Sequence, residues 1–182
     1  MSQVEVTGAC TEVEIEVEVP AERMWGLITD VGRIGEWSPE VRGGGWLEGE
    51  GPRPGARFLG RNGWRDGEVT CVVTEAERPG VFAWVVLDAA RDPERPGSIW
   101  RYELSPGSRP GTTRVRNRFT HGSGHTGLAR IIEQDPERGQ DHLRSRLEQL
   151  RSNMVRTIEA MARSQSAGST TAPGAARMET IR

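Results

Sequence analysis

Hydrophobic and polar residues alternate strictly near the start of the chain. In TEVEIEVEV, at 11–19, valine or isoleucine occupies every second position from 13 onward, and glutamate occupies most of the positions between. Such alternation is typical of a β-strand with one buried and one solvated face. Pro20 ends this strand and suits the start of a helix, which apolar spacing predicts over 21–30. A second, shorter helical turn is expected over 31–36.

Only strands and turns are expected from Val41 to Phe119. The predicted strands are 41–47, 57–62, 68–76, 81–87, 98–104 and 113–119, and segments rich in glycine and proline separate most of them. Short strands joined by turns indicate a meander, and therefore an antiparallel sheet. The three glycines at 43–45 indicate a bend or a bulge in the first of these strands.

A long amphipathic helix is predicted over 141–162. Six apolar residues recur there at helical spacing: Leu143, Leu147, Leu150, Met154, Ile158 and Met161. The preceding segment, 121–140, is long and polar with an apolar patch at 128–132, and we expect an enlarged loop. Such a loop is either a lid over a cavity or a variation without function. Residues 1–10 are expected to be a flexible N-terminus, 11–163 one domain and 164–182 a disordered tail.

The composition narrows the function classes. The 182 residues include 24 basic and 26 acidic side chains, and every basic one is an arginine. Without lysine, the chain has no side-chain amine for Schiff-base chemistry and no lysine-bearing phosphate loop. The formal net charge of −2 argues against a nucleic-acid partner. No apolar run is long enough for a membrane span, and two cysteines make no disulfide framework, so a cytoplasmic location is expected.

Four blocks of the sequence resemble the START / polyketide cyclase-dehydrase superfamily (SRPBCC), particularly its actinobacterial members. They are PAERMWGLITDVGRIGEWSPEV (20–41), GARFLGRNGW (55–64), CVVTEAERPGVFAW (71–84) and WRYELSP (100–106). The resemblance implies the helix-grip fold, an α+β architecture. In it, a curved seven-stranded antiparallel sheet surrounds a long C-terminal helix, two short helices follow the first strand, and a hydrophobic cavity lies inside. The family includes aromatase/cyclases, lipid and sterol carriers, hormone receptors and chaperone co-activators, so the resemblance defines the fold better than the chemistry.

Strand alternation assigns side chains to the face of the sheet that would line such a cavity. The expected ligand contacts are Phe58, Asn62, Cys71, Trp84, Trp100 and Phe119, with Trp37 at the entrance and Met154 on the long helix. Asn62, Tyr102, Asn117 and, if the last strand continues, His121 are the polar residues on this face. They either satisfy one another, the backbone or water, or they hydrogen-bond a ligand, because an unpaired buried polar group costs about 1–3 kcal/mol.

The favoured hypothesis is a cyclase or dehydratase that acts on a hydrophobic polycarbonyl molecule in natural-product biosynthesis, with no metal or organic cofactor. Tyr102, Asn117 and Asn62 would polarise a carbonyl or stabilise an enolate oxygen. His121, or a carboxylate at the mouth (Glu36, Asp66 or Glu68), would move the proton. The alternative is a non-catalytic carrier or sensor of a hydrophobic metabolite or lipid. A protein–protein module ranks third, and a homodimer stays open.

Three further patterns have simpler explanations. Cys71, alone on a strand, is more typical of a small core residue than of a nucleophile. His121, His125 and His142 have no nearby cysteine, so we expect no zinc site. If the first and last strands pair, the glutamates at 12, 14, 16 and 18 lie across from the arginines at 114, 116 and 118, which fixes the register.

Overall fold

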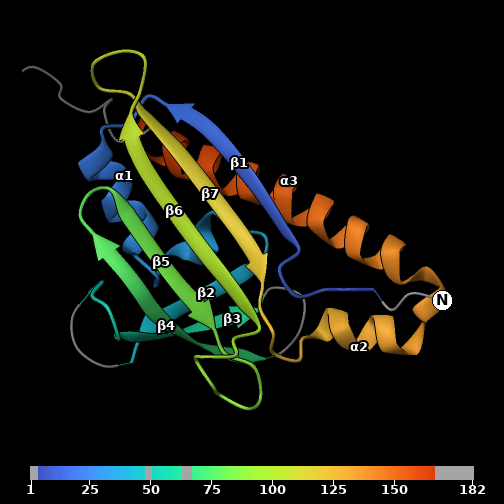
Figure 1. Ribbon diagram of the computed structural model, residues 1–182. Helices are drawn as coiled ribbons and strands as arrows, with labels where there is room; N and C mark the ends of the chain where they lie inside the picture. The colour runs from blue at the N-terminus through green and yellow to red at the C-terminus, as the bar shows by residue number, and fades with distance from the viewer. Residues whose placement is uncertain (1–3, 48–50, 63–66, 167–182) are drawn as a thin grey trace, which may run out of the picture.

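The computed structural model describes residues 4–47, 51–62 and 67–166. Its elements are β1 (Cys10–Val17), α1 (Ala21–Thr29), η1 (Ile34–Glu36), β2 (Val41–Trp46), β3 (Arg57–Asn62), β4 (Glu68–Glu77), β5 (Val81–Val86), β6 (Ser98–Pro106), β7 (Thr113–His121), α2 (Gly127–Gln134), η2 (Pro136–Arg138) and α3 (Gly139–Ser166). The strands form one seven-stranded sheet in the order β1-β7-β6-β5-β4-β3-β2. Every neighbouring pair is antiparallel. This is the helix-grip fold, with the sheet curled around α3 (Figure 1).

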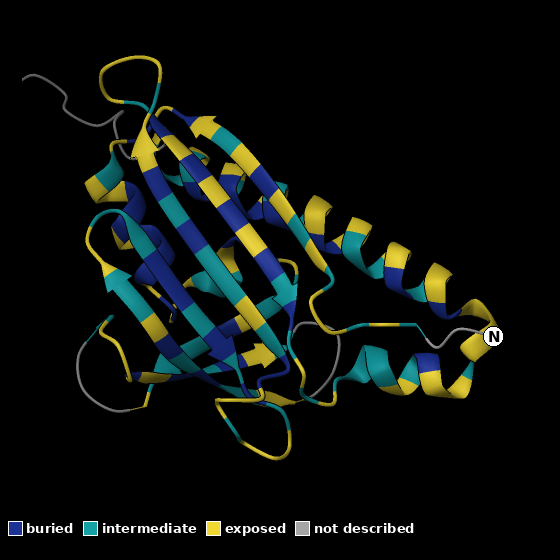
Figure 2. Cartoon of the chain, viewed as in Figure 1, coloured by how far each residue is buried: buried dark blue, intermediate teal, exposed yellow. Residues whose placement is uncertain are grey.

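β1 pairs with β7 in the register that the alternating charges predicted. Glu12 lies opposite Arg118, and Glu14 lies opposite Arg116. The guanidinium of Arg116 is 2.8 Å from the carboxylate of Glu14. Since these side chains occupy the solvated face, every second residue of β7 faces inward, and burial alternates along the strand (Figure 2).

The hairpin between β6 and β7 is also tied to β1. The Oε1 atom of Glu16 accepts hydrogen bonds from the backbone N–H of Ser108 at 2.9 Å, from its hydroxyl at 2.6 Å, and from the hydroxyl of Thr112 at 2.8 Å. These hydrogen bonds lower the pKa of the Glu16 carboxyl to about 2. The carboxylate therefore stays charged and keeps the end of β1 in register with the hairpin.

α3 buries the predicted apolar stripe. Leu150, Ile158 and Met161 are fully enclosed, and Met154 is 2% exposed. The second half of α3 packs on the sheet and on α1, whereas its first half extends past the end of the sheet, beside α2 (Figure 1). Neither α3 nor any other helix within the described ranges is long and apolar enough to cross a membrane.

The prediction of an enlarged loop over 121–140 is wrong, because this segment contains the helix α2. The hydroxyl of Thr126 accepts a hydrogen bond from the backbone N–H of Ala129 at 3.3 Å and caps the helix. Leu128, Ile131 and Ile132 lie at helical spacing, and Ile132 is buried. The apolar patch is therefore one face of an amphipathic helix, and it makes up part of the enclosure next to α3.

The bulge predicted for the glycine-rich strand is confirmed. The register of β2 against β3 shifts between Val41 and Gly43. At the next residue, Gly44, a Cβ atom would lie 2.3 Å from the carbonyl oxygen of Leu59 and 3.0 Å from that of Val31. Only glycine lets the backbone after α1 approach β2 this closely, which closes one end of the sheet.

We predict that Gly44→Ala lowers the free energy of unfolding by about 2 kcal/mol, because the added methyl group clashes with two backbone oxygens that cannot move independently. Gly45→Ala is the matched control, since a Cβ there meets nothing within 4 Å. Its effect should stay within about 0.5 kcal/mol. Urea denaturation of both variants measures the difference, and equal effects at the two positions would contradict the close-approach argument.

Candidate functional site

A cavity of about 820 Å³ lies between the concave face of the sheet and the helices α2 and α3. Its wall includes residues of β3 to β7, of the loop 87–97 after β5, of the segment 125–131 around the start of α2, and of α3 from His142 to Thr157. Cavities of roughly 300–1,000 Å³ are typical of sites for small organic molecules. The volume is therefore large enough for a multi-ring ligand.

An almost continuous row of aromatic rings crosses this cavity on β5, β6 and β7. Trp84 and Trp100 are stacked with their ring centres 6.0 Å apart and an angle of 8° between planes. Tyr102, two residues after Trp100 on β6, is also stacked with Trp84, with the ring centres 6.1 Å apart. Phe119 makes T-shaped ring contacts with Trp100, with the ring centres 4.9 Å apart, and with His121, with the ring centres 4.7 Å apart. The rings come from inward positions of adjacent strands, as the alternation predicted.

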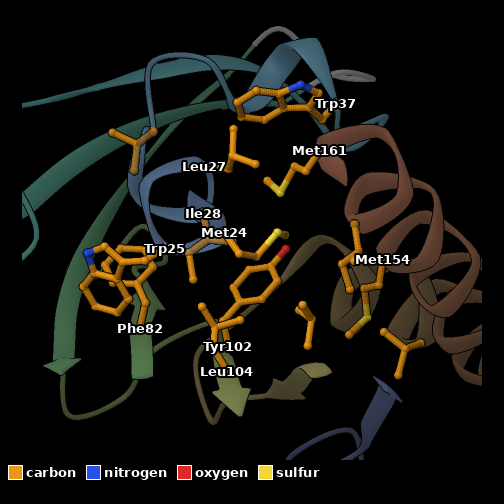
Figure 3. Packing of buried hydrophobic residues seen from close by; sticks show 14 of the residues in the cluster. Met24, Trp25, Leu27, Ile28, Trp37, Phe82, Tyr102, Leu104, Met154 and Met161 are labelled. Carbon is orange, nitrogen blue, oxygen red and sulfur yellow. The ribbon is translucent and has the colours of Figure 1, made fainter. Parts of the chain in front are cut away.

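The cavity begins where the packed core ends. Figure 3 shows the core side, where Met24, Leu27 and Met161 fill the space between α1 and α3. Tyr102 projects from β6 into this space with its hydroxyl pointing toward the helices, and Met154 lies across from it on α3. Both residues also line the cavity. Tyr102 and Met154 therefore lie at the boundary between the packed core and the cavity.

The structure places almost all of the expected site residues on the cavity wall. They are Phe58, Asn62, Cys71, Trp84, Trp100, Tyr102, Asn117, Phe119, His121 and Met154. Trp37 is the exception, and its expected place at the entrance needs correction. It is buried beside Met161 (Figure 3), outside the group of residues that line the cavity, and the guanidinium of Arg33 lies 5.0 Å from its ring centre. Trp37 follows a 3-10 turn, where strand parity gives no direction.

Two of the inward polar residues have buried atoms without a protein partner. Asn117 is 1% exposed and His121 is 5% exposed. Within the described residues, the Oδ1 atom of Asn117 and both ring nitrogens of His121 make no hydrogen bond. By contrast, the hydroxyl of Thr113, on the same strand and face, donates to the carbonyl of Val19 at 2.6 Å. The wall therefore offers unused hydrogen-bonding capacity at two defined places.

Burial also sets the protonation states on this wall. Loss of solvation and, as a smaller contribution, the positive charge of Arg146 together lower the pKa of His121 to about 4, so the imidazole is neutral near pH 7. Burial raises the pKa of the Cys71 thiol to about 12, which keeps the sulfur protonated and poorly nucleophilic. Burial likewise raises the pKa of the Tyr102 hydroxyl, which therefore remains a hydrogen-bond donor.

Sequence reasoning missed an ion pair in the wall. The Glu40 carboxylate is 2.8 Å from the guanidinium of Arg146 and accepts a hydrogen bond from the amide of Asn153 at 2.6 Å. The Glu40 side chain is only 14% exposed, and all three residues line the cavity. Glu40 directly precedes β2, and nothing local distinguishes Arg146 from the other arginines of α3, so no sequence signal points to this pair.

The carboxylates that were expected at the mouth differ from one another. Glu36 is exposed and lies 2.7 Å from Arg33, whose hydrogen bonds lower the pKa of this carboxyl. Glu68 lines the cavity and is paired with Arg61 at 2.9 Å. Asp66 lies outside the described residues. Of the carboxylates described around the cavity, Glu40 is thus the one that is held inside a buried hydrogen-bond network.

Two loops beside the cavity, 87–97 and 122–126, are joined by backbone hydrogen bonds. The N–H of Gly122 donates to the carbonyl of Gly97 at 3.0 Å, and the N–H of Gly124 donates to the carbonyl of Pro96 at 2.8 Å. A Cβ at Gly122 would lie 2.0 Å from that Pro96 oxygen, so glycine is required for the contact. Asp88 completes the junction by accepting the backbone N–H of His125 at 2.8 Å.

The other two histidines of the wall, His125 and His142, are each paired with a carboxylate. The Nε2 atom of His125 is 3.0 Å from Glu133, and that of His142 is 3.0 Å from Asp135. Across the described ranges, no group of three or more histidine, cysteine or acidic side chains is arranged to hold a metal ion.

This geometry defines a helix-grip protein with an aromatic-walled cavity. The sequence profile of the family described as "Polyketide cyclase / dehydrase and lipid transport" matches residues 8–148. The chain belongs to this family. No curated protein sequence matches the chain.

Solved structures share the fold. A Polyketide_cyc-like protein, Cgl2372 from Corynebacterium glutamicum, is similar with 25% identity and a TM-score of 0.62, covering 87% of this chain and 92% of that one. The protein XoxI from Bacillus cereus has 13% identity and a TM-score of 0.60, covering 86% and 94%. The di-domain ARO/CYC StfQ from the steffimycin biosynthetic pathway has 12% identity and a TM-score of 0.65. The match covers 87% of this chain and 51% of StfQ.

The buried, neutral His121 should make the protein sensitive to acid. Its folded-state pKa of about 4 lies below the ordinary value of 6.5, so the unfolded chain binds a proton first as the pH falls. Stability is therefore lost from about pH 6.5 downward. Between about pH 6 and pH 5, we predict that the wild type loses about 1 kcal/mol more than His121→Phe. Urea denaturation at both pH values measures this, and parallel losses would contradict the assignment.

Proposed function

We propose that this protein binds a hydrophobic polycarbonyl small molecule in the cavity and promotes its cyclisation or dehydration in natural-product biosynthesis. The observation that carries the proposal is the aromatic wall with two buried polar groups that have no protein partner, Asn117 and His121. Membership of the polyketide cyclase / dehydrase and lipid transport family and the shared fold with StfQ support it. The chemistry would need no bound metal or organic cofactor.

The main contribution of the wall would be containment. A flexible chain with several carbonyl groups has many ways to cyclise, and a narrow aromatic cavity restricts it to a few folded shapes. The Tyr102 hydroxyl, kept protonated by burial, would donate a hydrogen bond to a carbonyl oxygen. Such a hydrogen bond stabilises the negative charge that develops on this oxygen when an enolate carbon attacks the carbonyl carbon.

Proton transfer would fall to His121 or to the Glu40 carboxylate. A carbon between two carbonyls would give its proton to the base, the resulting enolate would attack a second carbonyl of the same chain, and the new alkoxide would take a proton back. Loss of water would then give the dehydrated ring. The low pKa of His121 makes it a weak base, so containment and carbonyl polarisation would supply most of the acceleration.

The second candidate is a non-catalytic carrier of a hydrophobic metabolite or lipid. The protonation states favour it, because the Cys71 thiol and the Tyr102 hydroxyl are both held in their protonated forms and the pKa of His121 is low. A carrier needs the cavity but no strong base. Native mass spectrometry of the purified protein tests this alternative, and recovery of a ligand that the protein leaves unchanged would favour it.

A synthetic tetraketide thioester tests the cyclase proposal. We predict that the wild type shifts the cyclised products, measured by liquid chromatography and mass spectrometry, away from those of the spontaneous reaction. Tyr102→Phe should reduce this protein-dependent product by at least about tenfold, since it removes one donor to the developing oxyanion. Thr113→Val is the control, because Thr113 lies on β7 outside the cavity. An unchanged product distribution with folded wild-type protein would rule out cyclase activity on this substrate class.

A further inference from the structure

The two buried polar groups without a protein partner lie on one strand with an aromatic ring between them. Asn117 and His121 are four residues apart on β7, and Phe119 is halfway between them. A strand rises about 3.3 Å per residue, so the two side chains leave the strand about 13 Å apart. Both line the cavity and are more than nine-tenths buried. The strand thus fixes the spacing of two polar points along one wall.

Each point offers a distinct hydrogen-bonding pattern. The Oδ1 atom of Asn117 accepts, and Tyr102, which lies directly across on β6, brings a hydroxyl donor to the same end of the wall. A neutral His121 ring carries one N–H donor and one nitrogen acceptor. A hydroxyl group, which both donates and accepts, satisfies either end.

A charged end group is disfavoured at both points. Asn117 and Tyr102 carry no charge near pH 7. At the other end, the charge of Arg146 is already balanced by Glu40 at 2.8 Å, so a ligand carboxylate would have to compete with an existing buried ion pair. Between the two ends, Trp84, Trp100 and Phe119 present a surface that suits flat, apolar rings.

We propose that the cavity takes an elongated, uncharged, largely aromatic molecule with a hydroxyl group at each end, one bound at Asn117 and the other at His121. This rests on the proposed role of the cavity as a ligand site, and it names the class of ligand. Each buried polar atom without a partner costs about 1–3 kcal/mol. β7 carries such atoms on two residues, the Oδ1 of Asn117 and both ring nitrogens of His121, whereas Thr113 on the same face is satisfied within the protein. A two-ended ligand satisfies both.

Four compounds test the spacing. The first is trans-4,4′-dihydroxystilbene, whose hydroxyls are separated by a length similar to that between the two polar points. trans-4-Hydroxystilbene lacks one hydroxyl, trans-stilbene lacks both, and 4,4′-biphenol keeps both at a shorter separation. Titrations that follow tryptophan fluorescence report binding, since Trp84 and Trp100 line the cavity. We predict that wild-type protein binds dihydroxystilbene about tenfold more tightly than either hydroxystilbene or biphenol.

Variants identify the two points. Asn117→Leu combined with Tyr102→Phe removes the first polar point, and His121→Phe removes the second. In each of these two variants, dihydroxystilbene and hydroxystilbene should bind within about twofold of each other. Thr113→Val removes a buried hydroxyl from the same strand face without touching the cavity, and it should keep the tenfold preference. Circular dichroism and thermal unfolding confirm that each variant is folded. The relative affinities of the wild-type protein for the four compounds test the spacing without any variant.

Two results would overturn the inference. The first is equal affinity of the wild type for stilbene, hydroxystilbene and dihydroxystilbene, or no binding of any of them. The second is a tenfold preference for dihydroxystilbene over hydroxystilbene that remains in both variants that lack one of the two polar points. The tetraketide assay is independent of these titrations, so a failed cyclisation with intact two-point binding would leave the ligand class standing for a carrier. Equal stilbene binding with successful cyclisation would remove only the two-hydroxyl inference.

Discussion

The antiparallel pairing of β1 with β7 is the constraint on which the interior depends. The side chains of a strand alternate between its two faces, so a slip of one residue would turn Asn117, Phe119 and His121 out to solvent. Charged pairs on the outer face oppose such a slip, because Arg116 meets Glu14 only in the observed register. Each exposed pair contributes little stability. Together the charged pairs specify one register of β1 against β7. This register determines which side chains of β7 face the cavity.

The interior is divided into a packed half and an open half. Between α1 and the second half of α3, methionine, leucine and tryptophan side chains fill the space and bury their apolar surface from water. Toward α2, the same sheet continues but the helices stand away from it, leaving the cavity. Tyr102 and Met154 belong to both halves. A protein that keeps an opening of this size gives up burial that a closed core would provide, and the well-packed half compensates for that loss.

Sequence reasoning succeeded where a residue's environment follows from its own position in a periodic element. The faces of β7 and the stripe of α3 were predicted because each depends on local spacing alone. It failed where a periodic pattern of apolar residues is too short to recognise or does not exist. The eight residues of α2 follow a glycine-rich segment that obscured their helical period. Trp37 follows a 3-10 turn, where no alternation of faces predicts the direction of a side chain. The pairing of Glu40 with Arg146 joins residues 106 positions apart, and single-sequence patterns carry no information about such a contact.

The chemistry that the wall lacks has a consequence for carbonyl-rich guests. Aldehydes and ketones react covalently with proteins mainly through amines, which form imines, and through thiolates, which form adducts. The chain has no lysine, and the Cys71 sulfur is held as a thiol. Arginine supplies the positive charge in this wall and is a far poorer nucleophile at neutral pH. The cavity wall therefore has no lysine amine and no thiolate that would form a covalent bond with an electrophilic ligand. A reactive carbonyl compound can bind and leave without modifying the protein.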